Sequence, residues 1–401
     1  MTGSQKLKVA FDKFDEKGPF PNLNDSLIFD RKYKEDGMSR YLRGHFIIPW
    51  IFNKFNTEEI ELIDTSEAKE KVIYPVGIKH TKSIYTISGT QQFDKVFNIH
   101  NHDNIDYFVI YLEEEPISPK DFYVIKNKFE ELVDRKKLIF ICNNLEVCKD
   151  AAKDNHAHRI GVGMELTLLK ILAWYGQTTL IYDKSKINKK FSIFNYSNNS
   201  DYDFRQATIS YLNHANLLEH AHYSHKKVEE INFENTENKE LKLLFKEIVE
   251  RDSKKVEEKE IFYTGQLIKL INDSCFSIVL EAYFENPSLK QTYVTEKSLR
   301  PILGKRPFIV VGQKRTLRGL KERGYKTFHP FINEEYDEES DPIKRYFKVL
   351  FEINKLCKLS IEELHNFMEP LKEIIEYNYN HFYDRIESEK QYLKDLMNEN
   401  T

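Results

Sequence analysis

Cysteine, glycine and proline are all scarce in this sequence, in which 401 residues include 4, 14 and 12 of them. Four cysteines with no CxxC pair argue against a disulfide framework and a zinc site, and they favour a reducing, cytoplasmic location. The low glycine and proline content, beside 40% hydrophobic residues, excludes collagen-like and disordered chains. We therefore expect globular domains, and the length suggests two of ordinary size.

Long hydrophobic runs and an excess of one charge are also missing. No apolar run reaches the roughly 18 to 20 residues that a membrane helix needs, and the polar residues Met1 to Lys6 do not resemble a signal peptide. Sixty basic residues against sixty-four acidic ones give a net charge of -4. Neither a membrane span nor secretion is expected, and any contact with nucleic acid must come from a local basic patch.

Short apolar runs alternate with polar helical stretches, which is typical of an α/β layer structure. Two series of strands are predicted, one in each half of the chain. They lie at 7–11, 60–63, 72–76, 107–112 and 138–142, then at 178–182, 191–194, 276–280 and 307–311. The predicted organisation is an α/β domain over 1–175, a second one over 176–355, and C-terminal helices over 356–401.

The C-terminal helices have clear sequence signals. Ser360 and Glu363 form a capping-box pattern, and apolar residues follow at helical spacing. Pro370 is expected to kink this helix or divide it in two. The apolar face must pack on something large, either its own domain or the junction between two domains.

Three short segments carry the most chemical information: 276–281, 293–297 and 307–312. They predict a buried strand that ends in a carboxylate, a loop, a helix that begins with Thr, Glu and Lys, and a second buried strand. A helix N-terminus has unpaired N–H groups and a partial positive charge, so it suits a diphosphate. Lys297 would add a charge-assisted contact there, and Glu296 would accept hydrogen bonds from ribose hydroxyls.

A second interpretation of these segments stays open. Thr295 then serves only as the N-cap of the helix, and Glu296 only interacts with the helix dipole.

The three segments resemble the donor-binding motif of the alpha-1,3-fucosyltransferase family of GT-B glycosyltransferases. That motif runs Phe-x-x-x-x-Glu-Asn, a spacer, Tyr-Val/Ile-Thr-Glu-Lys and a strand that ends in Gly. Phe276, Glu281 and residues 293–297 match this order, whereas Ala282 stands where Asn is usual. The resemblance implies that Glu296 meets the nucleotide ribose and Lys297 the diphosphate, with Glu281 and Thr295 in the same donor site.

An upstream segment resembles another part of the same family. Phe194 ends a strand, an Asn-rich turn with Asn199 follows, and Arg205 stands in the next helix. The resemblance implies that Arg205 and Asn199 belong to the donor site. A guanidinium, with its permanent charge and planar fork, would neutralise a leaving nucleoside diphosphate. The alternative is an ordinary surface arginine.

Two later segments, 324–328 and 331–337, resemble patterns of glycosyltransferase-like proteins encoded by large bacterial viruses. The resemblance as a whole covers roughly residues 105 to 350. It implies two Rossmann-like domains that face each other across a cleft, a nucleotide sugar as co-substrate, and neither a metal nor another cofactor. A viral protein of this kind would act in the host cytoplasm.

Inverting sugar transfer requires a base that deprotonates the acceptor hydroxyl. The family's base is a Glu that follows a strand of the N-terminal domain, and Glu115 in Glu113-Glu114-Glu115-Pro116 is the best match. Adjacent carboxylates raise one another's pKa, which suits a base. The alternatives are Glu114, then Asp103 and His156, and a solvated acidic turn with no catalytic role.

Histidines occur in two groups. His156 and His158 have a spacing that suits a metal, but no set of carboxylates stands beside them. The group from His214 to His225 is expected mostly on the surface. No metal site is predicted.

Segment 297–326 carries ten basic residues, against Glu296 and Glu322 as the acidic residues near it. A DNA backbone would use several of these charges, and an ordinary solvated surface explains them equally well. Together with the resemblance, this favours transfer of a sugar to a hydroxymethylated base in phage DNA. Two alternatives remain, namely a surface glycan or lipid-linked sugar as acceptor, and a non-catalytic binding protein on the same fold.

Overall fold

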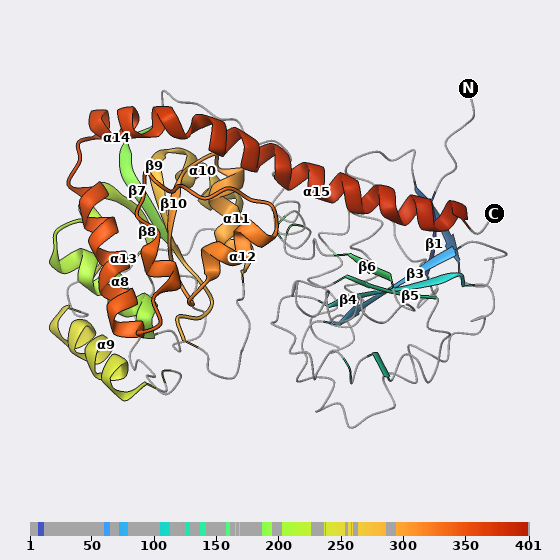
Figure 1. Cartoon of the computed structure of the whole chain (residues 1–401), viewed down its shortest axis with the longest axis horizontal. Helices are drawn as coiled ribbons and strands as arrows, with labels where there is room; N and C mark the ends of the chain where they lie inside the picture. Colours follow the sequence, from blue (N-terminus) through green and yellow to red (C-terminus); the bar gives the residue numbers. More distant parts are fainter. Residues whose placement is uncertain are drawn as a thin grey trace. The chain divides into compact units, whose positions relative to one another are not determined.

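The structure is a computed structural model (Figure 1). It describes residues 7–11, 60–64, 72–78, 105–112, 123, 126–127, 137–141, 158–160, 165, 168, 187–194, 203–225, 236, 238–252, 256–257, 259, 264–285 and 294–399. Contacts along the chain divide it into two compact units. The first unit comprises 1–170 and 384–401, and the second comprises 171–383.

The first unit contains a parallel sheet. Its strands are β1 (Leu7–Phe11), β2 (Ile60–Asp64), β3 (Val72–Ile78), β4 (Tyr107–Leu112), β5 (Leu138–Ile141) and β6 (His158–Ile160), in the order β2-β1-β3-β4-β5-β6. Phe108 and Val109 are adjacent and both buried, so both faces of β4 are covered, as its continuous apolar run predicts. The five strands expected in this half are confirmed, and β6 was not expected.

The second unit contains another parallel sheet. Its strands are β7 (Lys189–Phe194), β8 (Ala221–Ser224), β9 (Ser274–Leu280) and β10 (Phe308–Val311), in the order β10-β9-β7-β8. All seven residues of β9 are buried. Three expected strands are confirmed here, whereas the strand expected at 178–182 lies outside the described residues. β8 lies within the group of histidines that was expected on the surface.

The strand order of this second sheet reverses direction at one point, between β7 and β9. From β7 the chain moves outward to β8 and then returns to the other side of β7 to form β9 and β10. The chain therefore leaves the carboxyl ends of β7 and β9 in opposite directions, which makes this edge a topological switch point. Ligands of open α/β sheets bind at this kind of switch point.

Helices pack on both faces of the second sheet. The helices that the structure describes are α8 (Asp203–His214), α9 (Lys239–Asp252), α10 (Thr264–Asn272), α11 (Glu296–Leu303), α12 (Thr316–Glu322), α13 (Pro342–Cys357), α14 (Ile361–Met368) and α15 (Lys372–Glu399). In Figure 1, α8 and α13 lie on one side of the sheet and α10 and α11 on the other. Contacts of α10 and α11 with β9, and of α13 with β10, agree with this arrangement.

The C-terminal helices follow their sequence signals closely. The Ser360 side chain accepts from the Glu363 backbone N–H, and Glu363 accepts from the Ser360 backbone N–H, so the capping box is confirmed. Pro370 lies in a 3-10 turn between α14 and α15, which confirms that it interrupts the helix. The start of α15 belongs to the second unit and its end, from Asp384, to the first.

Helix α15 packs on a turn that only glycine fits. Gly324 has a φ of +87°, and a Cβ on it would lie 2.6 Å from Nε2 of His381 on α15. Asn378 of α15 hydrogen-bonds both the N–H and the carbonyl of Lys326, each at 2.8 Å. The turn at 324–328 therefore anchors the start of the C-terminal helix within the second unit. No helix among the described residues is long and apolar enough to cross a bilayer.

Candidate functional site

Five of the expected donor-site residues lie at the switch point of the second sheet. Arg205 is the third residue of α8, which follows β7, and Glu281 directly follows β9. Thr295, Glu296 and Lys297 form the start of α11, the next helix after β9. The fold thus brings together residues that are up to 92 positions apart in the chain.

Arg205 connects the two strand ends. Its side chain is buried, and its Nε donates to the backbone carbonyl of Glu281 at 2.9 Å, with Nη2 donating to the same oxygen. The guanidinium is therefore fixed against the end of β9. The interpretation of Arg205 as an ordinary surface residue is wrong.

Glu281 caps the beginning of α11. Its Oε1 accepts from the backbone N–H of Thr295 at 3.2 Å and from the hydroxyl of Ser298. Its Oε2 accepts from the Thr295 hydroxyl at 2.6 Å and from the Ala282 backbone N–H at 3.0 Å. A carboxylate at this position also interacts favourably with the helix dipole. Both oxygens are used, so the carboxylate holds the site together and is not open to a ligand.

Thr295 is the N-cap of α11, as the second interpretation of this segment predicted. Its hydroxyl accepts from the Lys297 backbone N–H at 3.2 Å while it donates to Glu281. The side chain is 2% exposed. Like Glu281, Thr295 shapes the site from within.

Glu296 differs from both of these residues. Its Oε1 accepts from Nζ of Lys297 at 2.9 Å and from Nη2 of Arg300 at 3.0 Å. Burial raises the pKa of Glu296, but attraction by Lys297 and Arg300 outweighs burial and lowers the pKa to about 2. The side chain is 16% exposed, and an ionised carboxylate, with about four acceptor positions, can take further hydrogen bonds from ligand hydroxyls.

Lys297 lies where positive charges are crowded. Burial lowers its pKa, attraction by Glu296 opposes this, and repulsion from Arg205 and Arg300 adds to the lowering. Its side chain is 17% exposed, so it lies at the edge of the cluster. A bound anion at this point would relieve the repulsion between the cations.

Arg300 belongs to the same cluster and was not expected there. It lies one helical turn after Glu296 and holds that carboxylate, with its own side chain 6% exposed. The spacing of four residues between an acid and a base on one helix was the signal that could have identified it. In the sequence it stood only among the ten charges of the basic segment.

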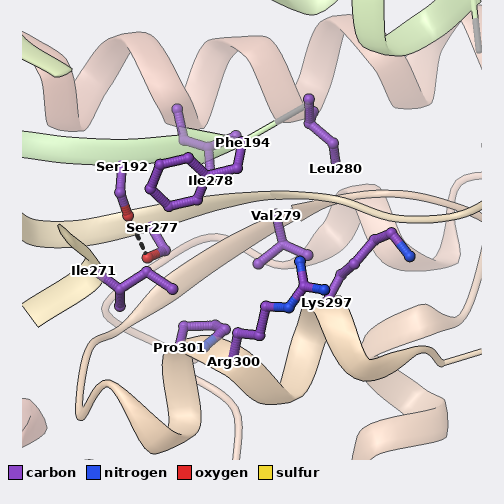
Figure 2. Close-up of a pocket in the computed structure, with 10 residues that line it drawn as sticks. All are labelled: Ser192, Phe194, Ile271, Ser277, Ile278, Val279, Leu280, Lys297, Arg300 and Pro301. Atoms are coloured by element: carbon purple, nitrogen blue, oxygen red, sulfur yellow. Dashed lines mark hydrogen bonds between the residues drawn. The ribbon is translucent and has the colours of Figure 1, made fainter. Parts of the chain in front are cut away.

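A small cavity lies beside the cluster, between the sheet and helices α10 and α11. Its volume is about 20 Å³, which is room for about one water molecule. Figure 2 shows Lys297 and Arg300 of α11 at its border, with the guanidinium of Arg300 directed at Val279 of β9. The buried hydroxyls of Ser192 and Ser277 share a 2.7 Å hydrogen bond at the other end. This cavity cannot hold a nucleotide, so a donor would have to lie against the outer edge of the sheet.

The remaining expected residues lie outside the described part of the chain. These are Glu115, Glu114, Asp103 and His156 of the first unit, and Asn199 and Tyr293 of the second. Their roles stay predictions.

Acidic residues in the motif at 331–337 have structural roles in the described structure. Glu334 accepts from the Thr327 hydroxyl at 2.6 Å and the Phe328 backbone N–H at 2.7 Å. Asp337 accepts from two backbone N–H groups at the start of α12. Burial raises the pKa of Asp337 to about 6, although these two hydrogen bonds oppose the rise. Both carboxylates stabilise turns within the second unit.

Most charges of the basic segment already have partners inside the protein. Six of the ten cations pair with carboxylates, namely Lys297, Arg300, Lys305, Arg315, Arg318 and Lys321. Arg306 is buried and donates to the backbone carbonyls of Ser274, Asn272 and Lys305. Contact of this segment with DNA stays a prediction, with fewer open charges than the sequence suggested.

Among the described residues, no three His, Cys, Asp or Glu side chains gather as a metal site requires. No family model, curated protein or solved structure matches this chain, so a family assignment depends on the motifs alone.

Proposed function

We propose that this protein is a glycosyltransferase that binds a nucleotide-sugar donor at the carboxyl edge of β7 and β9. The observation that carries the proposal is the convergence of charged side chains at the switch point. Three cations, Arg205, Lys297 and Arg300, lie near the carboxylates of Glu281 and Glu296, and repulsion from the two arginines lowers the pKa of Lys297. Cations gathered at the start of a helix favour an anionic ligand such as a diphosphate.

The geometry supports different roles for these residues. The partly exposed ammonium of Lys297 would bind a phosphate oxygen, and the charges of Arg205 and Arg300 would add to the attraction. The ionised carboxylate of Glu296 would accept a hydrogen bond from a ribose hydroxyl. Glu281 and Thr295 would keep α11 in place without touching the donor.

Sugar transfer would proceed by direct displacement at the anomeric carbon. The acceptor oxygen forms a bond to this carbon as the bond from the carbon to the diphosphate oxygen breaks, and the base takes the acceptor proton. Positive groups fixed near the leaving diphosphate stabilise the charge that develops on it. Glu115 of the first unit is proposed as the base, in a GT-B arrangement of two Rossmann-like domains.

The acceptor is proposed from the sequence. A hydroxymethylated base in phage DNA is the first acceptor to test, although the ion pairs of the basic segment weaken its support. A surface glycan or a lipid-linked sugar is the second. Mass analysis of nucleosides from DNA incubated with the protein and a panel of nucleotide sugars distinguishes them, and the absence of product on every acceptor would favour a non-catalytic binding protein.

The donor site itself is tested by calorimetric titration with nucleoside diphosphates. Lys297→Ala should weaken binding by about 1.5 to 3 kcal/mol, because a charge-assisted hydrogen bond is lost. Lys305→Ala is a matched control, since Lys305 is also paired with a carboxylate and is 23% exposed. Unchanged affinity in Lys297→Ala, or an equal loss in the control, would refute the assignment.

A further inference from the structure

Helix α13 has an unusual exposed face. Every exposed residue between Pro342 and the C-cap Lys358 is either a lysine or a phenylalanine. They are Lys344, Phe347, Lys348, Phe351, Lys355 and Lys358. Their spacing of three, four and seven residues places them on one side of the helix. No carboxylate is among the exposed residues of this helix.

The two phenylalanines are not needed for the core of the unit. The opposite face of α13 already buries Tyr346, Val349 and Ile353 against the rest of the unit. Phe347 is 50% exposed and Phe351 68% exposed, one helical turn apart. Two large apolar side chains left beside each other in water indicate a surface that is covered by something else.

Three of the lysines around them pair with carboxylates. Lys348 lies 2.8 Å from Glu339, and the ion pairs of Lys344 and Lys355 measure 3.9 Å and 3.4 Å. The exposed pair of Lys344 contributes little in water, whereas the carboxylates that pair with Lys348 and Lys355 are 20% and 6% exposed. Because lysine has a long flexible stem, each ammonium can turn from its carboxylate to an external anion.

We propose that this face of α13 docks the protein on an anionic lipid bilayer. Phenylalanines that enter the boundary between headgroups and acyl chains, with lysines beside them on lipid phosphates, are the pattern of interfacial helices. A second copy of the chain fits poorly, because two such faces would oppose lysine to lysine. A nucleic acid fits poorly as well, because it offers no apolar layer for the phenylalanines. The proposal does not depend on the nucleotide-sugar activity.

Co-sedimentation of the full-length chain with vesicles tests the proposal without any nucleotide. Vesicles of phosphatidylcholine and phosphatidylglycerol in a roughly 2:1 ratio are compared with pure phosphatidylcholine. We expect at least about tenfold stronger partitioning onto the anionic vesicles, since each lysine near such a surface contributes about fivefold when it is not already neutralised. Absence of binding, or equal binding to both vesicles, overturns the proposal.

Variants separate the two components of this surface. The double change Phe347→Ser with Phe351→Ser, and the fourfold change of the lysines to glutamine, should each reduce partitioning by about tenfold or more. Leu243→Ser on α9 is the control, because Leu243 is 66% exposed yet lies beside the exposed acids Glu240 and Glu247. Circular dichroism checks that each variant is folded.

Loss of binding in the control as large as in the double variant overturns the proposal. The proposal is also overturned if the protein does not bind vesicles but forms a dimer in sedimentation velocity, or binds DNA, in a way that the two Phe→Ser changes abolish.

Discussion

The two sheets of this protein share a strand order but differ in what stands at their switch points. In each sheet the first strand is flanked by the second and third, so one switch point lies between β1 and β3 and the other between β7 and β9. Only in the second sheet do described charged side chains converge there. In the first sheet, the acidic residues at 113–115 follow β4, one strand away from the switch point. The same topology thus gives two switch points, and their side chains distinguish them.

This difference suggests a division of labour between the sheets. The second sheet would hold the donor, because three cations and the ionised Glu296 meet at its switch point. The first would supply the base, because the sequence after β4 has three carboxylates in a row. Each half of this division can be tested separately, since donor affinity and transfer rate are different measurements.

The largest expected effect concerns the base in the first sheet. Glu115→Gln should reduce the transfer rate by about 100- to 10,000-fold, the usual loss when general-base catalysis is removed. Donor affinity should survive, because the donor site lies in the other sheet. Rates and nucleoside diphosphate affinity are measured on the same preparation.

Glu114→Gln is the control for this experiment. It should have much less effect, because successive side chains of an extended segment point to opposite sides. If Glu114→Gln is the inactive variant, the base lies in the predicted segment, but Glu114 and not Glu115 is the base. If both variants stay active, the base lies elsewhere, and Asp103 and His156 are next.

The second largest effect should come from Glu281 and should appear in stability. Glu281→Ala leaves the donors of Thr295, Ser298 and Ala282 without their acceptor at the start of α11. We expect a loss of about 3 kcal/mol or more in the free energy of unfolding, because buried donors without partners cost about 1 to 3 kcal/mol each. Urea denaturation measures it. A loss below about 1 kcal/mol would show that α11 does not depend on this cap.

A smaller effect is expected from Arg300, which sharpens the charge argument. Arg300→Met keeps most of the side-chain volume but removes one of the three positive charges of the cluster. Nucleoside diphosphate affinity should fall by about tenfold, within the range for a lost charge-assisted contact. Titration at two salt concentrations should show a weaker salt dependence than in the wild type. Tighter binding of the nucleoside diphosphate by Arg300→Met would contradict the proposed role of the Arg300 charge.

The sequence predicted the core of the fold because its signals were local. The continuous apolar runs of β4 and β9 identified them as strands buried on both faces, and the capping box at Ser360 gave the start of α14. β8 was missed because Ala221–Ser224 has two polar residues in four and lies among histidines. β6 has three residues, which is too short for a periodic pattern.

The site was predictable only in part for a similar reason. Glu296 and Lys297 were found from a short motif, but the motif did not reveal that the Glu281 carboxylate is used up by partners 14 and 17 residues later in the chain. Arg300 looked like any surface arginine, since burial is not visible in one sequence. The side chains that hold a site in place depend on tertiary contacts, whereas those that stand at a helix start follow from local rules.

The smallest expected effect is a pH dependence that separates Glu296 from a purely structural carboxylate. Its pKa in the folded protein is about 2, against an ordinary value of 4.5, so its stabilising contribution is complete above about 4.5 and is lost as pH falls toward 2. The difference in unfolding free energy between wild type and Glu296→Gln should therefore shrink between pH 4.5 and 2. In a Lys297→Ala background the difference should be smaller at neutral pH, since the strongest attraction is gone. A difference that stays constant, or grows, as the solution is acidified would mean that Lys297 and Arg300 do not hold this carboxylate in its ionised form.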